Sequence, residues 1–108
     1  MTRTESERLS DIAEALAAIH EHLLDAEQSG GVLRDALLYR FVVIGEAVKH
    51  LTPETRAAAP GVQWAAVARL RDLIAHEYFR IDMDLILKIV EDDLPALEAA
   101  VAGLREEP

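Results

Sequence analysis

The 108-residue chain has no cysteine, few aromatic residues and no long apolar run. Without cysteine it can form no disulfide, no thiolate nucleophile and no metal site with cysteine ligands. Aromatic residues make up 5% of the chain and hydrophobic residues 51%, so a core must be built mainly from aliphatic side chains. Together with abundant Ala, Leu and Glu, these totals favour packed helices.

Targeting and membrane signals are lacking as well. The first residues, MTRTESERLSDIAE, contain no apolar stretch of the kind found in a signal peptide. The apolar runs are also much shorter than the roughly 20 residues that span a bilayer as a helix. We therefore expect a single domain over residues 1–108 that works in the cytoplasm without a membrane partner.

Positive charge is scarce overall but unevenly distributed. Eleven Lys and Arg residues oppose twenty Asp and Glu residues, a net charge of −9, which argues at first against a nucleic-acid partner. Residues 34–80 nevertheless hold seven of the basic residues and five acidic ones, a local net charge of +2, whereas the flanks carry −11. The middle of the chain can therefore meet a polyanion, although charge alone does not indicate that it does.

Apolar residues recur at helical spacing through most of the chain, and no stretch alternates long enough to predict a strand. The pattern predicts long helices over residues 5–28, 32–51, 63–80 and 82–106. The second of these is apolar on more than one side and is expected to be central. A short helix is predicted between Thr52 and the APGV sequence at 59–62. The expected fold is therefore all-α, an up-and-down bundle of four long helices plus one short helix.

Two features of these helices are expected to shape the packing. Pro95 lies inside the pattern of the last helix, so we expect a kink or break near residues 92–94. Gly45 lies inside the second helix, where glycine costs up to about 1 kcal/mol relative to alanine. We therefore expect Gly45 to allow the close approach of a neighbouring helix.

The segment RLRDLIAHEYF, residues 69–79, carries polar residues that a helix core does not need. On a helical wheel, Tyr78 falls on the core stripe with Arg71 at its edge, whereas His76 falls on an opposite face with Asp72, Phe79 and small alanines. Arg71 and His76 are about 140° apart on an ideal helix, so a site that uses both requires a distortion, a long reach or a second subunit. We favour a site formed between two copies, although each residue alone is more often structural.

Other residues are weaker candidates. Glu46 can pair with a site arginine or face solvent, and Arg40, Lys49 and Arg80 can contact phosphate or belong to the solvated surface. His20 and His22 point to different sides of a helix and make a poor metal pair. No metal site is expected.

RDLIAHEY, residues 71–78, fits R-x4-H-x-Y and resembles the signature of HepT-like toxins in the HEPN superfamily. The resemblance extends over about residues 5–104. RFVVIGEAVKHL (40–51) is similar to the family's Ile-Gly-Glu-Ala helix, and EDDLPALEAAV (91–101) resembles its C-terminal helix. PGVQWAAVARLRDLIAHEYFRID (60–82) follows the family's order of Pro, Trp, Arg, His-x-Tyr and Ile-Asp.

This resemblance implies an HEPN-like fold and a metal-independent, cofactor-free endoribonuclease that acts as the toxin of a toxin–antitoxin pair. Arg71 and His76 would be its catalytic pair, working at a homodimer interface, with assembly beyond the dimer left open. Tyr78 would contact substrate or receive AMP from the antitoxin, a minimal nucleotidyltransferase. Asp72 stands where the family commonly has Asn, and its charge would influence His76 or weaken phosphate binding. The alternative is a dimeric module with little or no catalysis that engages a nucleotidyltransferase partner.

Overall fold

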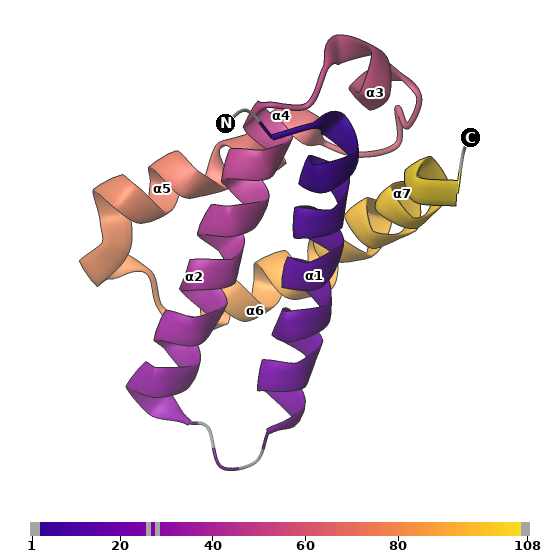
Figure 1. The fold of residues 1–108 in the computed structure, drawn as a ribbon. Helices are drawn as coiled ribbons and strands as arrows, with labels where there is room; N and C mark the ends of the chain where they lie inside the picture. Colours follow the sequence, from indigo (N-terminus) through magenta and orange to yellow (C-terminus); the bar gives the residue numbers. More distant parts are fainter. Residues whose placement is uncertain (1–2, 26, 28, 107–108) are drawn as a thin grey trace.

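The computed structural model describes residues 3–25, 27 and 29–106. Every regular element in these ranges is a helix, so the all-α prediction is confirmed (Figure 1). In chain order the helices are α1 (Glu5–Leu24), α2 (Gly30–Lys49), α3 (Pro53–Ala57), α4 (Trp64–Ala68), α5 (Leu70–Glu77), the 3-10 helix η1 (Tyr78–Arg80), α6 (Met83–Asp92) and α7 (Leu94–Glu106).

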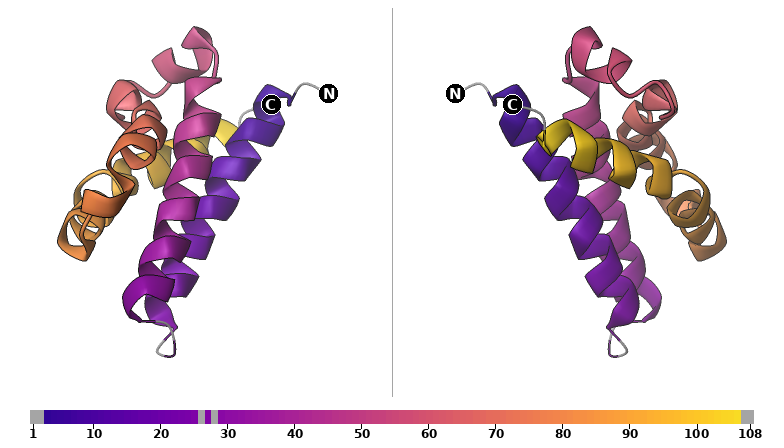
Figure 2. Two further views of the ribbon diagram at one scale, coloured as in Figure 1. Left: turned by 90° about the vertical axis from the view of Figure 1, so that its left-hand side faces the viewer. Right: turned by 90° about the vertical axis from the view of Figure 1, so that its right-hand side faces the viewer.

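The antiparallel pair α1 and α2 forms the centre of the molecule, with α7 crossing one side and α5 lying on another (Figure 2). Thr4 caps α1 through a capping box with Glu7, which satisfies two backbone amides at the helix start. Helix α2 packs against α1, α4, α5 and α6, so its predicted central position is confirmed. The predicted end of the first helix, residue 28, lies outside the described residues, and α1 ends at Leu24.

The buried apolar side chains form one cluster drawn from most of the helices. Nearly all of them are aliphatic, as the composition predicts. Tyr78, predicted on the core stripe, is only half-buried at the edge of this cluster. The largest side chains with almost no exposed surface are Ile12, Ile19, Leu37, Leu38, Phe41, Ile44, Val48, Ile86, Leu97 and Val101.

Two of the four predicted long helices are interrupted. The predicted helix over residues 63–80 is divided at Arg69 into α4 and α5 and ends in η1, so its expected continuity is wrong. The division falls where the chain lies against Gly45 of α2: a Cβ added to Gly45 would lie 2.8 Å from the backbone nitrogen of Arg71. The expected close approach at Gly45 is therefore confirmed.

The last predicted helix is broken at Asp93, between α6 and α7, as Pro95 predicts. Pro95 is the second residue of α7, where its missing amide hydrogen costs no helical hydrogen bond. None of the described helices has both the length and the apolar character required to cross a membrane.

Candidate active site

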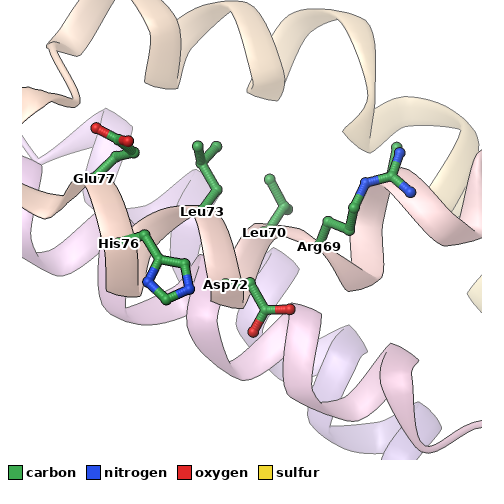
Figure 3. A pocket seen from close by; sticks show the side chains of 7 residues that line it. Arg69, Leu70, Asp72, Leu73, His76 and Glu77 are labelled. Atoms are coloured by element: carbon green, nitrogen blue, oxygen red, sulfur yellow. The ribbon is translucent and has the colours of Figure 1, made fainter.

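Helix α5 and the first residue of η1 carry the predicted motif between two open grooves of about 470 Å³ each. The first, here the α2–α5 groove, includes Arg71 and Tyr78. The second, here the outer groove, includes Asp72 and His76 (Figure 3). The α2–α5 groove is lined by Asp35, Leu38, Tyr39, Val42, Arg71, Ile74, Ala75 and Tyr78. The outer groove is lined by Ala66, Arg69, Leu70, Asp72, Leu73, His76 and Glu77.

Arg71 is held by two carboxylates. Its Nε lies 2.9 Å from Oε2 of Glu46 on α2, and its Nη1 lies 3.4 Å from Oδ1 of Asp72. The other oxygen of Glu46 lies 3.0 Å from Nε2 of His50, one helical turn further along α2. Glu46 therefore pairs with the motif arginine, the first of the two alternatives predicted for it, and does not simply face solvent. The Arg71 side chain remains 45% exposed, so it is still open to solvent.

His76 is exposed on the outer groove, on the same side of α5 as the carboxyl group of Asp72 (Figure 3). Leu73 and Glu77 line the same groove and point away from His76 in this view. Among the described residues no hydrogen bond or ion pair joins His76 to Arg71, and the two line different grooves. One copy of the chain therefore keeps the two motif residues on different faces of α5, as their spacing predicts.

Tyr78 is fixed by two neighbouring residues of α2. Its hydroxyl donates a hydrogen bond to Oδ1 of Asp35 at 2.5 Å. Arg34 lies with its guanidinium 4.7 Å from the centre of the Tyr78 ring, and it donates hydrogen bonds to the carbonyl oxygens of Tyr78 and Ile81. These contacts hold η1 against α2 where the chain leaves α5.

The contact with Asp35 also changes the acidity of the tyrosine. The hydrogen bond to Asp35, the partial burial of the tyrosine and the negative charge of Asp35 together raise the pKa of Tyr78 above the ordinary 10.0. Arg34 opposes this rise in part. The phenol is therefore protonated at neutral pH.

Sequence reasoning did not identify Arg34 and Asp35 as partners of Tyr78. A usable signal was the spacing of Asp35, Tyr39, Val42 and Glu46, which places all four on one face of α2. Pairing Glu46 with the motif arginine would have aligned that face with α5. Asp35 would then have fallen near the end of the motif.

The three candidate phosphate contacts have different surroundings. Arg80 is 86% exposed on η1, with its Nε 3.8 Å from Glu77. Lys49 is exposed at the end of α2. Arg40 is half-buried, with its guanidinium 5.1 Å from the ring centre of Tyr39. Arg80 is therefore the best placed of the three, two residues beyond Tyr78.

The structure gives His20 a partner other than a metal. Its Nε2 lies 2.7 Å from Oε1 of Glu98, which links α1 to α7. Within the described ranges, no three His, Cys, Asp or Glu side chains are grouped to hold a metal ion.

Comparison with known families gives a match over nearly the whole chain. The model of the ribonuclease HepT-like family matches residues 8–104, a range that includes Arg71, His76 and Tyr78. The chain belongs to the HepT-like family.

Relatives of this HepT-like chain carry names that refer to RNA cleavage. A probable ribonuclease HepT of Thermococcus cleftensis is 31% identical, over 98% of this chain and all of its own length. A putative RNase of Methanocaldococcus jannaschii is 31% identical over 86% of this chain and 89% of its own length. The chain spans about half (46%) of another protein of that organism, named a gamma-glutamylcyclotransferase and putative RNase, with 31% identity over 92% of this chain. No solved structure matches.

Proposed function

We propose that this HepT-like chain is a metal-independent endoribonuclease that acts in the cytoplasm as the toxin of a toxin–antitoxin pair. The observation that carries the proposal is the family match over residues 8–104, a range that contains Arg71, His76 and Tyr78, with Arg71 and His76 both exposed on α5. An exposed arginine and histidine on a short surface helix are open to a long polymer such as RNA.

The residue chemistry suits cleavage through the RNA's own 2′-OH. One histidine takes the proton of the 2′-OH as its oxygen attacks the adjacent phosphorus, and a second donates a proton to the leaving 5′-oxygen. A guanidinium such as that of Arg71 offers two parallel donors to the phosphate oxygens and stays charged throughout. The products are a 2′,3′-cyclic phosphate and a 5′-OH end.

The proposed site combines residues of two copies of the chain. Since Arg71 and His76 line different grooves of α5, a two-fold arrangement of two α5 helices supplies both histidines to one substrate. The outer groove suits such a contact, because Leu73, which lines it with His76, is 36% exposed, and Phe79, three residues beyond His76, is 97% exposed. Arg80, close to Tyr78, is the proposed phosphate contact outside the motif; Lys49 and Arg40 are weaker candidates.

The proposed antitoxin is a minimal nucleotidyltransferase that transfers AMP to Tyr78. The tyrosine shares the α2–α5 groove with Arg71. An AMP group on its hydroxyl would place bulk and negative charge where Arg71 is proposed to receive the RNA phosphate. Modification would therefore block substrate binding without removing a catalytic residue.

A second candidate function is a dimeric module that binds the nucleotidyltransferase but cuts RNA weakly or not at all. The pairing of Arg71 with both Glu46 and Asp72 favours it, since a substrate phosphate must compete with two carboxylates. The net charge of −9 favours it as well.

Cleavage of a labelled RNA in the presence of EDTA separates the two candidates. Purified wild type is compared with Arg71→Ala, His76→Ala and the control His20→Ala, whose histidine pairs with Glu98 on another face of the molecule. The nuclease proposal expects cyclic phosphate ends from wild type and the control, with large losses in the two motif variants. Equal cleavage by all four proteins would leave the binding module as the function.

A further inference from the structure

Asp35 and Tyr78 form a short polar contact between α2 and the end of the motif. The Tyr78 hydroxyl lies 2.5 Å from Oδ1 of Asp35, although the two residues are 43 positions apart in the sequence. The Asp35 side chain is 60% exposed, so its carboxylate can pass a proton to solvent. The contact therefore joins a nucleophilic oxygen to a carboxylate that is open to water.

Arg34 fixes the tyrosine in this contact. Its guanidinium lies over the Tyr78 ring and donates to the carbonyl oxygens of Tyr78, the first residue of η1, and of Ile81, the residue that follows η1. Its side chain is only 21% exposed. The tyrosine is therefore restrained through both its ring and its backbone, and its side chain lines the open α2–α5 groove together with Asp35.

We infer that Asp35 is the general base for nucleotidyl transfer to Tyr78, and that Arg34 is the positioning residue of this reaction. The inference rests on the proposed modification of Tyr78. In the step, the Tyr78 oxygen attacks the α-phosphorus of ATP held by the nucleotidyltransferase, the bond to pyrophosphate breaks, and pyrophosphate leaves. The hydroxyl proton passes to the Asp35 carboxylate and then to solvent.

The acidity of the tyrosine is consistent with this role. Because the pKa of Tyr78 is raised, almost no phenolate is present at neutral pH, and the proton must leave as the new bond forms. The other charged or titratable side chains that contact the pair or line its groove are Arg34 and Tyr39 on α2 and Arg71 on α5. Neither arginine can accept the proton, and a neutral phenol such as Tyr39 is a much weaker base than a carboxylate.

The first test follows the mass of the intact protein during incubation with a minimal nucleotidyltransferase of the proposed type, ATP and Mg²⁺. Wild type is compared with Asp35→Asn, Tyr78→Phe and the control Asp93→Asn, which changes an exposed aspartate at the α6–α7 junction. Asp35→Asn is expected to slow the transfer on the order of 10²-fold at neutral pH, with a rate that rises with pH as phenolate forms. The control is expected to match wild type.

The outcomes of this test are distinct. If Asp35→Asn gains mass as fast as wild type, and Tyr78→Phe gains none, Asp35 is not the general base, while nucleotidyl transfer to Tyr78 stands. If wild type gains no mass, or if the gain survives Tyr78→Phe, the proposed modification fails and the inference fails with it. Melting temperatures within a few degrees of wild type show that Asp35→Asn is folded.

A second test needs no partner protein. N-acetylimidazole acetylates tyrosine hydroxyls, and peptide mass spectrometry gives the rate at Tyr78 relative to Tyr39, the only other tyrosine. If Asp35 accepts the proton, Asp35→Asn lowers the relative rate at Tyr78 near neutral pH several-fold. If the hydrogen bond only masks the phenol, the same substitution raises that rate, which would overturn the inference.

Discussion

At the scale of single residues, the site is defined by how its charges are paired. Arg71 faces Glu46 from α2 and Asp72 from its own helix. The first of these ion pairs crosses between helices and holds the guanidinium in the groove. The second joins neighbouring residues through a longer contact, so Asp72 contributes mainly a negative charge beside the proposed phosphate position.

Asp72→Asn is predicted to strengthen RNA binding. The substitution removes a negative charge beside Arg71 and leaves the pair with Glu46 in place. Exposed ion pairs are worth about 0.2–1 kcal/mol, so the expected decrease in Kd is about 1.4- to five-fold at low salt. Fluorescence anisotropy with a short RNA, measured in a His76→Ala background to prevent cleavage, checks the effect. An unchanged Kd would show that Asp72 does not weaken phosphate binding.

At the scale of helices, the approach of α2 to α5 depends on the absence of a side chain at residue 45. A Cβ there would lie 2.8 Å from the backbone nitrogen of Arg71 and 3.2 Å from its Cβ, so the two helices would have to separate. The position of Arg71 relative to Glu46 therefore rests on a glycine that the helix itself does not favour.

Gly45→Ala is predicted to lower the free energy of unfolding by up to about 2 kcal/mol, because an overpacking cost of about 1–3 kcal/mol outweighs the roughly 1 kcal/mol of helix propensity gained. Urea unfolding followed by the fluorescence of Trp64, the only tryptophan, measures this change. Gly103→Ala in α7 is the matched control, since an added Cβ meets nothing within 4 Å there. It is expected to be neutral or stabilising. Equal effects of the two substitutions would contradict the packing argument.

A second link between elements joins the start of α1 to α3. Glu5 accepts hydrogen bonds from the hydroxyl of Thr55 at 2.5 Å and from the hydroxyl and backbone nitrogen of Thr52 at 2.8 and 2.9 Å. Burial alone would raise the pKa of Glu5, but these hydrogen bonds outweigh it and lower the pKa below the ordinary 4.5. The ionised carboxylate therefore stabilises the folded state.

The stabilisation by Glu5 is predicted to depend on pH. Because the pKa of Glu5 is lowered in the folded state, its contribution to the free energy of unfolding is fully present above pH 4.5. That contribution is lost as the pH falls through the pKa of Glu5 in the folded state. Glu5→Gln should therefore destabilise the protein at pH 7 and matter progressively less below pH 4.5. Urea unfolding over this range checks it, with the exposed Glu21→Gln as control. If the difference in unfolding free energy between wild type and Glu5→Gln did not change with pH, the stabilising role of the ionised Glu5 carboxylate would be contradicted.

Sequence patterns predicted these elements well where the signal is local. Apolar spacing identified the helices, Pro95 the break before α7, and Gly45 the close approach of a neighbouring helix. The division at Arg69 was missed because it arises where α4 and α5 lie against α2, which periodicity does not reveal. The contacts of Arg34 and Asp35 with Tyr78 were missed because they join residues more than 40 positions apart.

At the scale of the whole molecule, the proposed active site has to combine two grooves that lie on opposite faces of α5. Arg71 and Tyr78 belong to the α2–α5 groove, and His76 belongs to the outer groove. In the proposed homodimer, each reaction uses the histidines of both copies. The activity of a mixed dimer therefore reports directly on the site, because a single His76→Ala subunit should inactivate it.

The most direct measurement mixes wild type and His76→Ala at constant total concentration, under conditions in which subunits exchange, and follows RNA cleavage. If the histidines of both copies act together, activity falls with the square of the wild-type fraction, to about a quarter of the wild-type rate for an equal mixture. A linear fall, to about half the rate in the same mixture, would mean that each copy acts alone and would contradict the shared site.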